Sequence, residues 1–98
     1  MSFSLIYDAE AREDLKALKP HERATILSAI GIQLREQPTE ETQNRKLMRP
    51  NPFFTWELRV QPFRIFYNVD VASGEVRIQR IGCKINNEVY IRGAKFEL

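Results

Sequence analysis

Two arginines, Arg59 and Arg64, are expected to face each other across the turn of a β-hairpin in the middle of the chain. Alternating apolar and polar residues predict a strand over 54–60, and a similar run predicts a second strand over 63–67. A turn centred on residues 61–62 pairs the two arginines. Like charges directly opposite each other destabilise a sheet, so a sheet that keeps this pair is expected to hold an anion. Phosphate matches guanidinium geometry well.

Other polar residues are predicted to gather at the same end of the sheet. Glu57 shares a face with Arg59, Lys84 lies on the next strand, and Tyr90 comes six residues later and could fold back over this end. For RNA, the arginines would hold phosphates and Tyr90 would stack on a base or act in proton transfer. Glu57 would accept a proton from a ribose 2′-hydroxyl, and the cations would stabilise the transition state. In the alternative interpretation, Arg59 forms an ion pair with Glu57 or with an acidic tail, and the cations are solvated without binding an anionic ligand.

A long irregular segment over 38–52 precedes the hairpin and carries Lys46 and Arg49. Three prolines and the lack of a clean period argue against a regular element there. Loops of this length in a compact domain are usually functional or mobile. The two cations are therefore interpreted as phosphate contacts or solvated loop charges.

The elements that must position these residues predict an α+β fold in a single domain, 1–98. An N-terminal strand precedes an antiparallel helical hairpin, which packs on a mainly antiparallel sheet of about four strands. A turn at Ser73-Gly74 pairs Arg64 with Cys83. For the tail, 84–98, the sequence allows two predictions: a helical turn, or a terminal hairpin or edge strand. The predicted elements outside the central hairpin are a strand over 3–7, helices over 8–18 and 22–37, and a strand over 75–82.

The charge of the chain is small but unevenly distributed. The net charge is +2 over 98 residues, with −3 in residues 1–44 and +5 in residues 45–98. This asymmetry is typical of a protein with an anionic partner on one face. The N-terminus lacks the pattern of a secretory signal and no apolar run reaches the ~20 residues of a membrane span, which predicts a cytoplasmic protein without a membrane partner.

The composition argues against metal and cofactor chemistry. Cys83 is the single cysteine and His21 the single histidine, so neither an internal disulfide nor a cysteine-cluster metal site is expected. Cys83 is interpreted as a small buried residue and His21 as an exposed one. Asp8, Glu13 and Asp14 are interpreted as solvated helix residues without metal spacing.

The order of these elements and motifs resembles the RelE/ParE toxins of bacterial toxin–antitoxin pairs. The resemblance covers nearly the whole chain. It implies a small α/β fold, a cognate antitoxin as partner, and no metal or other cofactor. RelE-type members are endoribonucleases that cut messenger RNA on the ribosome, whereas ParE-type members poison DNA gyrase. The motifs that carry it are Lys46-Leu47, Trp56-x-Leu58-Arg59-Val60, Phe63-Arg64-Ile65-x-Tyr67, Ile81-Gly82-x-Lys84 and Glu88-Val89-Tyr90.

The resemblance assigns roles position by position. Arg64 matches the family arginine at the scissile phosphate, and Lys84 stands where RelE-type toxins place an arginine. Tyr90 matches a tyrosine of the active toxins. The chain departs from the family at Thr55 and Glu57, where the best-known RelE members carry lysines that act in proton transfer.

The predicted function is therefore a translation-inhibiting toxin that acts as an endoribonuclease on ribosome-bound messenger RNA. In this prediction Arg64, Lys84, Tyr90 and Glu57 are catalytic, and Arg59, Lys46 and Arg49 bind RNA. Two alternatives stay open: a gyrase-inhibiting toxin, and a toxin-fold protein that binds its antitoxin without catalysis.

Overall fold

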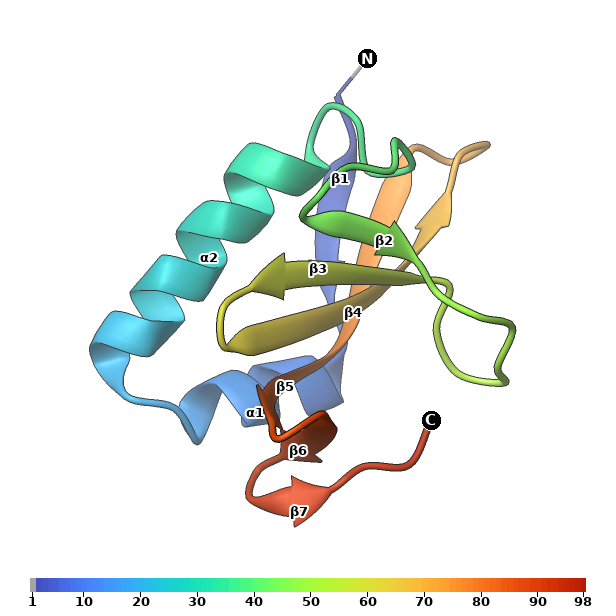
Figure 1. Cartoon of the computed structure of the whole chain (residues 1–98). Coiled ribbons are helices and arrows are strands. Elements are labelled where there is room, and N and C mark those ends of the chain that lie inside the picture. Colours follow the sequence, from blue (N-terminus) through green and yellow to red (C-terminus); the bar gives the residue numbers. More distant parts are fainter. Residues whose placement is uncertain (1) are drawn as a thin grey trace.

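The computed structural model describes residues 2–98, in which one strand is followed by two helices and then by six further strands (Figure 1). In chain order the elements are β1 (Ser4–Tyr7), α1 (Ala9–Lys16), α2 (Pro20–Leu34), β2 (Arg45–Leu47), β3 (Trp56–Val60), β4 (Phe63–Asp70), β5 (Glu75–Ile85), β6 (Glu88–Ile91) and β7 (Ala94–Lys95).

The central hairpin has the predicted register. Strands β3 and β4 are antiparallel, and Arg59 is the direct partner of Arg64. The turn holds Gln61 and Pro62, as the sequence predicts. Because side chains alternate along a strand, Glu57 and both arginines project from one face of the hairpin while Leu58 and Ile65 project from the other.

The sheet is larger than the predicted four strands. Its order is β2-β3-β4-β5-β6-β7, and β1 runs parallel to β5. Strand β2 lies inside the stretch expected to be irregular, and it pairs Lys46 with Glu57. The tail adopts the hairpin alternative, because β6 and β7 pair with each other. Both additions depend on long-range or edge pairing, which leaves little local signal in a short strand.

The pairing of β4 with β5 differs from the sequence prediction by two residues near the turn and by one residue near Arg64. The turn before β5 is longer than expected, and a β-bulge leaves Gln79 without a partner between two paired positions. Arg64 therefore stands opposite Gly82, and Cys83 stands opposite Phe63. A shift of one residue reverses the face of each side chain, so Cys83 packs against the core and Gly82 lies on the Arg64 face.

The two helices pack on the sheet, as predicted, but they do not lie along one another. Figure 1 shows α1 crossing the lower end of β5 and α2 rising away from it past β3. Pro20 opens α2 as its first residue, and the Glu22 carboxylate accepts a hydrogen bond from the Lys19 N–H at 3.0 Å. The two helices diverge from the short link between them and cover different parts of one sheet face (Figure 1).

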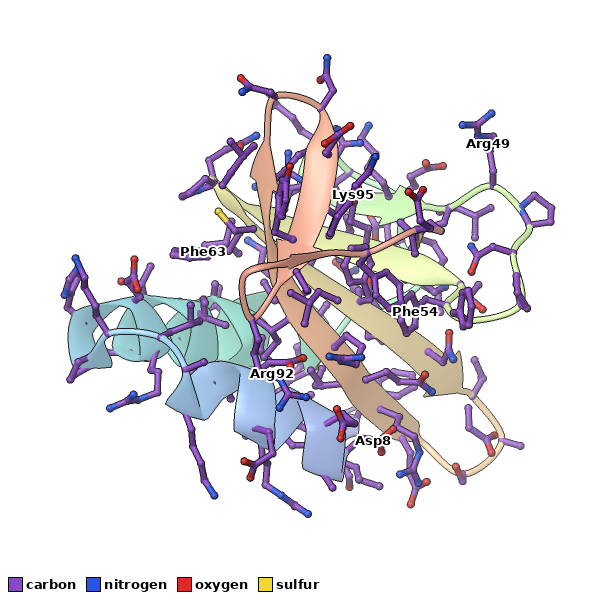
Figure 2. The ribbon with its side chains drawn as sticks, turned by 90° about the horizontal axis from the view of Figure 1, so that it is seen from below. Asp8, Arg49, Phe54, Phe63, Arg92 and Lys95 are labelled. Atoms are coloured by element: carbon purple, nitrogen blue, oxygen red, sulfur yellow. The ribbon has the colours of Figure 1, made fainter. Side chains whose placement is uncertain are left out.

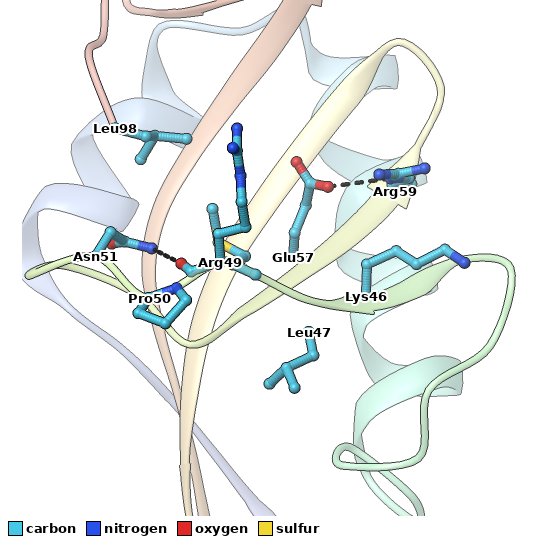
Figure 3. Close-up of a pocket in the computed structure, with 9 residues that line it drawn as sticks. Lys46, Leu47, Arg49, Pro50, Asn51, Glu57, Arg59 and Leu98 are labelled. Carbon is cyan, nitrogen blue, oxygen red and sulfur yellow. Dashed lines mark hydrogen bonds and ion pairs between the residues drawn. The ribbon is translucent and has the colours of Figure 1, made fainter.

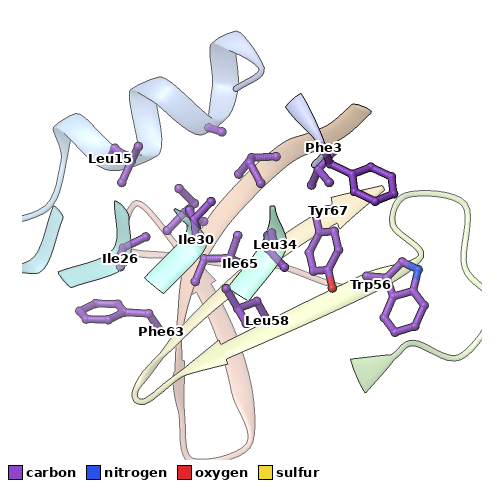
Figure 4. Packing of buried hydrophobic residues seen from close by; sticks show 14 residues of the cluster. Phe3, Leu15, Ile26, Ile30, Leu34, Trp56, Leu58, Phe63, Ile65 and Tyr67 are labelled. Atoms are coloured by element: carbon purple, nitrogen blue, oxygen red, sulfur yellow. The ribbon is translucent and has the colours of Figure 1, made fainter. Parts of the chain in front are cut away.

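The core fills the space between the helices and that face (Figure 4). Ile26, Ile30 and Leu34 of α2 are buried against sheet residues such as Leu58 and Ile65. Trp56 and Tyr67 belong to the same cluster, as their strand alternation predicts, and the Tyr67 hydroxyl donates to the Pro38 carbonyl at 2.7 Å. The opposite face, which carries Glu57 and the arginine pair, is left to polar and aromatic residues.

Candidate functional site

A shared carboxylate holds the facing arginines together. The Arg59 Nε donates to Glu57 Oε2 at 3.0 Å, and the Arg64 Nε lies 3.7 Å from Glu57 Oε1. The side chain of Glu57 is 12% exposed and that of Arg59 is 37% exposed. The alternative interpretation of the sequence, in which Arg59 forms an ion pair with Glu57, is therefore confirmed for this pair. One carboxylate serves two guanidinium groups, so the trio keeps an excess positive charge.

Arg64 is the most deeply placed member of this trio, with only 5% of its side chain exposed. Its Nη1 donates to the Phe63 carbonyl at 3.0 Å and to Gln61 Oε1 at 3.3 Å. Among the buried side-chain nitrogen and oxygen atoms of residues 2–98, its Nε is the one that lacks a hydrogen-bond partner. An unsatisfied buried donor costs about 1–3 kcal/mol, which an anion accepting from it would recover.

Electrostatics oppose the charge on this arginine. Burial lowers the pKa of the Arg64 guanidinium below its ordinary value, Glu57 raises it, and Arg59 lowers it again. A cation that is buried, unsatisfied and next to a like charge is stabilised by any second anion that reaches it. A phosphate would supply both the charge and the missing acceptor.

A pocket of about 570 Å³ opens beside this trio (Figure 3). Three cations line it, Lys46, Arg49 and Arg59, together with Glu57. Figure 3 shows Lys46 and Arg59 at one end of the pocket and Leu98 at the other. The pairing of β2 with β3 places Lys46 next to Glu57, so the strand that sequence analysis missed brings a predicted RNA-binding residue into the site. We call this the cationic pocket.

Lys84 reaches the same face from β5. It follows Gly82 by two residues, and Gly82 is the direct partner of Arg64, so alternation puts Lys84 on the Arg64 side of the sheet. The Lys84 N–H donates to the Pro62 carbonyl at 2.9 Å, which ties β5 to the turn of the central hairpin. Lys84 therefore shares its face with Arg64 despite the shifted register.

Tyr90 is not brought into this group. It pairs with Cys83, which faces the helices, and it lines a different pocket with Asp14, Leu18 and Cys83. Its hydroxyl donates to Glu88 Oε2 at 3.0 Å, and this bond raises the pKa of the phenol. In this structure Tyr90 is thus on the sheet face opposite the arginines.

Gly82 has a structural role that sequence analysis did not identify. A Cβ built on it would lie 2.7 Å from the Tyr90 carbonyl oxygen and 2.9 Å from the Ile91 side chain. Only glycine lets β6 cross this closely over the residue opposite Arg64. The signal was present in the Ile81-Gly82-x-Lys84 motif, as a glycine inside a strand pattern.

Asp14 is not the solvated residue that the sequence predicted. It is 2% exposed, and its carboxylate accepts two hydrogen bonds from Arg80 at 2.9 and 3.1 Å and one from Arg92 Nε at 2.9 Å. The Ile81 N–H donates a further bond at 2.9 Å. Asp14 therefore fastens α1 to β5 and to the β6–β7 turn. Its position between Ala11 and Leu15, on the buried stripe of the helix, was the available sign.

Other expectations concern metal and membrane chemistry. His21 is exposed, as predicted, whereas Cys83 packs against the core but is only half-buried. Within the described residues, no group of three or more histidine, cysteine, aspartate or glutamate side chains is arranged to hold a metal ion. The same residues include no helix with the length and apolarity of a membrane span.

Comparison with known proteins defines the fold class. No family model matches the sequence, and no curated protein matches it. Among solved structures, the toxin–antitoxin complex RelBE2 from Mycobacterium tuberculosis is similar with a TM-score of 0.75 and 23% identity, over 86% of this chain and 93% of that chain. The archaeal RelE–RelB complex from Pyrococcus horikoshii is similar with a TM-score of 0.66 and 15% identity, over 83% and 93%.

The isolated RelE toxin of E. coli is a further structural match. Its TM-score is 0.64 at 15% identity, and 84% of each chain is covered. The chain thus has an α+β fold in which two helices pack on a mainly antiparallel sheet, and that fold is the RelE fold. The resemblance to RelE/ParE toxins is confirmed at the level of the fold.

Proposed function

We propose that this protein is the toxin of a toxin–antitoxin pair and that a cognate antitoxin neutralises it. The support is the RelE fold, which it shares with chains from two RelB–RelE complexes. The motifs that carry the sequence resemblance lie on β2, on the arginine-bearing hairpin and on the β5–β6 region. In this proposal the protein works in the cytoplasm, where ribosomes and messenger RNA are available.

We further propose that the toxin is an endoribonuclease that cuts messenger RNA on the ribosome. One observation carries this proposal: the buried Arg64 Nε has no hydrogen-bond acceptor among residues 2–98, and its neighbours Glu57 and Arg59 line the cationic pocket. A scissile phosphate at that position would accept from Arg64 and Arg59. Lys46 and Arg49 would hold neighbouring phosphates along the pocket.

The proposed chemistry uses the side chains on this face. Glu57 accepts the proton of a ribose 2′-hydroxyl, and the 2′-oxygen attacks the adjacent phosphorus. The bond from phosphorus to the 5′-oxygen breaks, which leaves a 2′,3′-cyclic phosphate, and the 5′-oxygen takes a proton from water. Arg64, Arg59 and Lys84 stabilise the additional negative charge that builds on the phosphate oxygens. Tyr90 takes no part, because it lies on the other face.

Two observations favour a second candidate, a toxin that binds its target without cutting RNA. Glu57 replaces a family lysine and is already engaged with Arg59 and Arg64. Tyr90 is turned away from them. In this second candidate, the target that the resemblance to ParE toxins implies is DNA gyrase. A non-catalytic variant of the same candidate is a toxin-fold protein that binds only its antitoxin.

Expression in cells with an inducible promoter separates these candidates. The wild-type chain should arrest growth and produce new 5′ ends within translated regions, detected by primer extension. Arg64→Ala should abolish both effects while still co-purifying with the antitoxin. Arg12→Ala, which removes an exposed arginine on α1, is the matched control and should behave as wild type. Growth arrest with double-strand DNA breaks and without new 5′ ends would replace the endoribonuclease by the gyrase poison.

A further inference from the structure

A second pocket lies beside the cationic pocket and shares two chain segments with it. It has a volume of about 460 Å³. The segment 48–54 lines the cationic pocket through its first half and the second pocket through Phe53 and Phe54. The C-terminal segment does the same with Leu98 and Phe96. We call the second pocket the aromatic pocket.

The wall of the aromatic pocket is a cluster of phenylalanine rings on the sheet face that carries Glu57. Phe53 meets Phe96 edge-on with ring centroids 5.8 Å apart, and Phe54 stacks on Phe66 at 5.0 Å. Phe53 remains 47% exposed despite these contacts. Figure 2 shows Phe54 on the sheet face over which the C-terminal segment runs. A flat apolar ligand could therefore cover Phe53 without displacing the cluster.

The cluster connects the aromatic pocket to the proposed site of cleavage. Phe66 is the direct strand partner of Glu57, so the stacked pair of Phe54 and Phe66 begins next to the arginine trio. Glu57 lines the cationic pocket and Phe54 lines the aromatic pocket, so the stacked ring pair connects the two pockets. This arrangement suits a chain molecule with a phosphate at one point and a planar group at the next.

Polar groups at the edge of the aromatic pocket are arranged for a neutral planar ligand. The β-bulge lets both Gln79 and Arg80 line the pocket, whereas regular alternation would turn one of them away. The Gln79 amide offers a donor and an acceptor side by side. Ion pairs neutralise the two carboxylates of the pocket: Arg77 Nη1 donates to Asp8 Oδ1 at 2.8 Å, and Arg92 Nη2 donates to Glu10 Oε2.

We propose that the aromatic pocket binds one nucleobase of the RNA whose phosphate is held at Arg59 and Arg64. This inference rests on the proposed function, since it takes single-stranded RNA as the ligand. The base stacks on the exposed ring of Phe53, and its edge forms hydrogen bonds with Gln79. Stacking supplies affinity for any base, and the amide supplies a preference among bases.

The test measures the affinity of the full chain for short single-stranded RNA with 2′-O-methyl riboses, which cannot be cleaved by 2′-hydroxyl attack. Phe53→Ala should weaken binding about tenfold, the size expected for loss of one stacked base. Phe53→Leu keeps the apolar volume and should lose most of the same affinity. Val71→Ala removes an exposed apolar side chain at a distant turn and is the matched control.

Abasic RNAs locate the base. Removing the base at one position should weaken wild-type binding about tenfold, and Phe53→Ala should then add no further loss at that position. Gln79→Ala should reduce the preference among the four bases there. Equal affinities of wild type and both Phe53 variants would overturn the proposal, as would a loss that is independent of the abasic position.

The Arg64→Ala variant separates failure of this inference from failure of the proposed function. If Arg64→Ala weakens RNA binding and the Phe53 variants do not, the aromatic pocket is not a base site but the cationic pocket still binds RNA. If Arg64→Ala leaves RNA binding unchanged, the RNA function itself is wrong and the base site is lost with it.

Discussion

Arg59 and Arg64 stand directly opposite each other on strands β3 and β4, with their side chains on the same face of the sheet. A facing pair of like charges is unfavourable unless an anion lies between them. Glu57 supplies one anion and reaches Arg59 with good geometry, but it leaves the Arg64 Nε without a hydrogen bond. The arrangement is therefore incomplete in a way that a second anion would complete.

Glu57→Gln tests the proposed base and should change catalysis and binding in opposite directions. Loss of the proton acceptor should slow RNA cleavage in a purified translation system by about 100-fold or more. Loss of a negative charge beside two arginines should at the same time tighten binding of uncleavable RNA, because phosphate no longer competes with the carboxylate.

Glu36→Gln provides the control for this change, since it removes an exposed carboxylate outside the lining of the cationic pocket. It should leave both cleavage and binding at wild-type values. Cleavage by Glu57→Gln at the parental rate would remove Glu57 from the mechanism and leave it a positioning role between Arg59 and Arg64.

Arg64→Met should separate stability from function. The substitution removes a buried cation with an unsatisfied donor and keeps much of the side-chain volume, while Glu57 retains its bond to Arg59. Because Glu57 keeps its bond to Arg59, removal of Arg64 does not leave an unpaired buried charge, and loss of the unsatisfied buried donor recovers about 1–3 kcal/mol. Urea denaturation should show an unfolding free energy equal to or above that of wild type, while RNA binding and growth arrest are lost.

Arg64→Lys is the companion variant, because it keeps the charge but lacks the guanidinium fork. It should bind RNA more weakly than wild type and more strongly than Arg64→Met. A large drop in the unfolding free energy of Arg64→Met would show that Arg64 is primarily a structural residue.

The central hairpin could be predicted from the sequence because its information is local. Period-two alternation and the short turn at residues 61–62 fix which residues of β3 and β4 pair, and so they place Arg59 opposite Arg64. The pairing of β4 with β5 could not be fixed in the same way. The turn is two residues longer than predicted and Gln79 forms a β-bulge, and neither feature has a distinctive sequence pattern.

Contacts between distant parts of the chain account for the other differences. Asp14 is buried because Arg80 and Arg92, 66 and 78 residues away, bring their guanidinium groups to it. Strand β2 forms because β3 offers it a paired edge, not because three residues predict a strand. Helix periodicity identified α1 and α2, but it does not specify how they diverge on the sheet.

Asp14→Ala should be strongly destabilising. The buried carboxylate accepts hydrogen bonds from Arg80, Arg92 and the Ile81 N–H. Its removal leaves two guanidinium groups and one backbone N–H without this acceptor. Removing one partner of a buried charge network typically costs about 3–5 kcal/mol. Urea denaturation should measure a loss of this size.

The neighbouring Glu13 offers the control for that measurement. Its carboxylate forms a surface pair with Lys16 in which both side chains are at least half exposed. Such pairs are worth little, so Glu13→Ala should change the unfolding free energy by less than about 0.5 kcal/mol. If the two variants unfold alike, the Asp14 network does not fasten α1 to the sheet.

Gly82→Ala should loosen the β5–β6 crossing without touching any charged group of the site. The added methyl would lie 2.7 Å from the Tyr90 carbonyl oxygen, so β6 must move away from β5. Overpacking of this kind costs about 1–3 kcal/mol. Hydrogen exchange should accelerate at the amides of 88–91, whereas the β3–β4 hairpin should keep its protection. Gly31→Ala is the matched control, because nothing lies within 4 Å of a Cβ there and helical alanine is favoured over glycine by about 1 kcal/mol. Unchanged exchange at β6 in Gly82→Ala would mean that the strand crossing tolerates a side chain, and the requirement for glycine opposite Arg64 would be refuted.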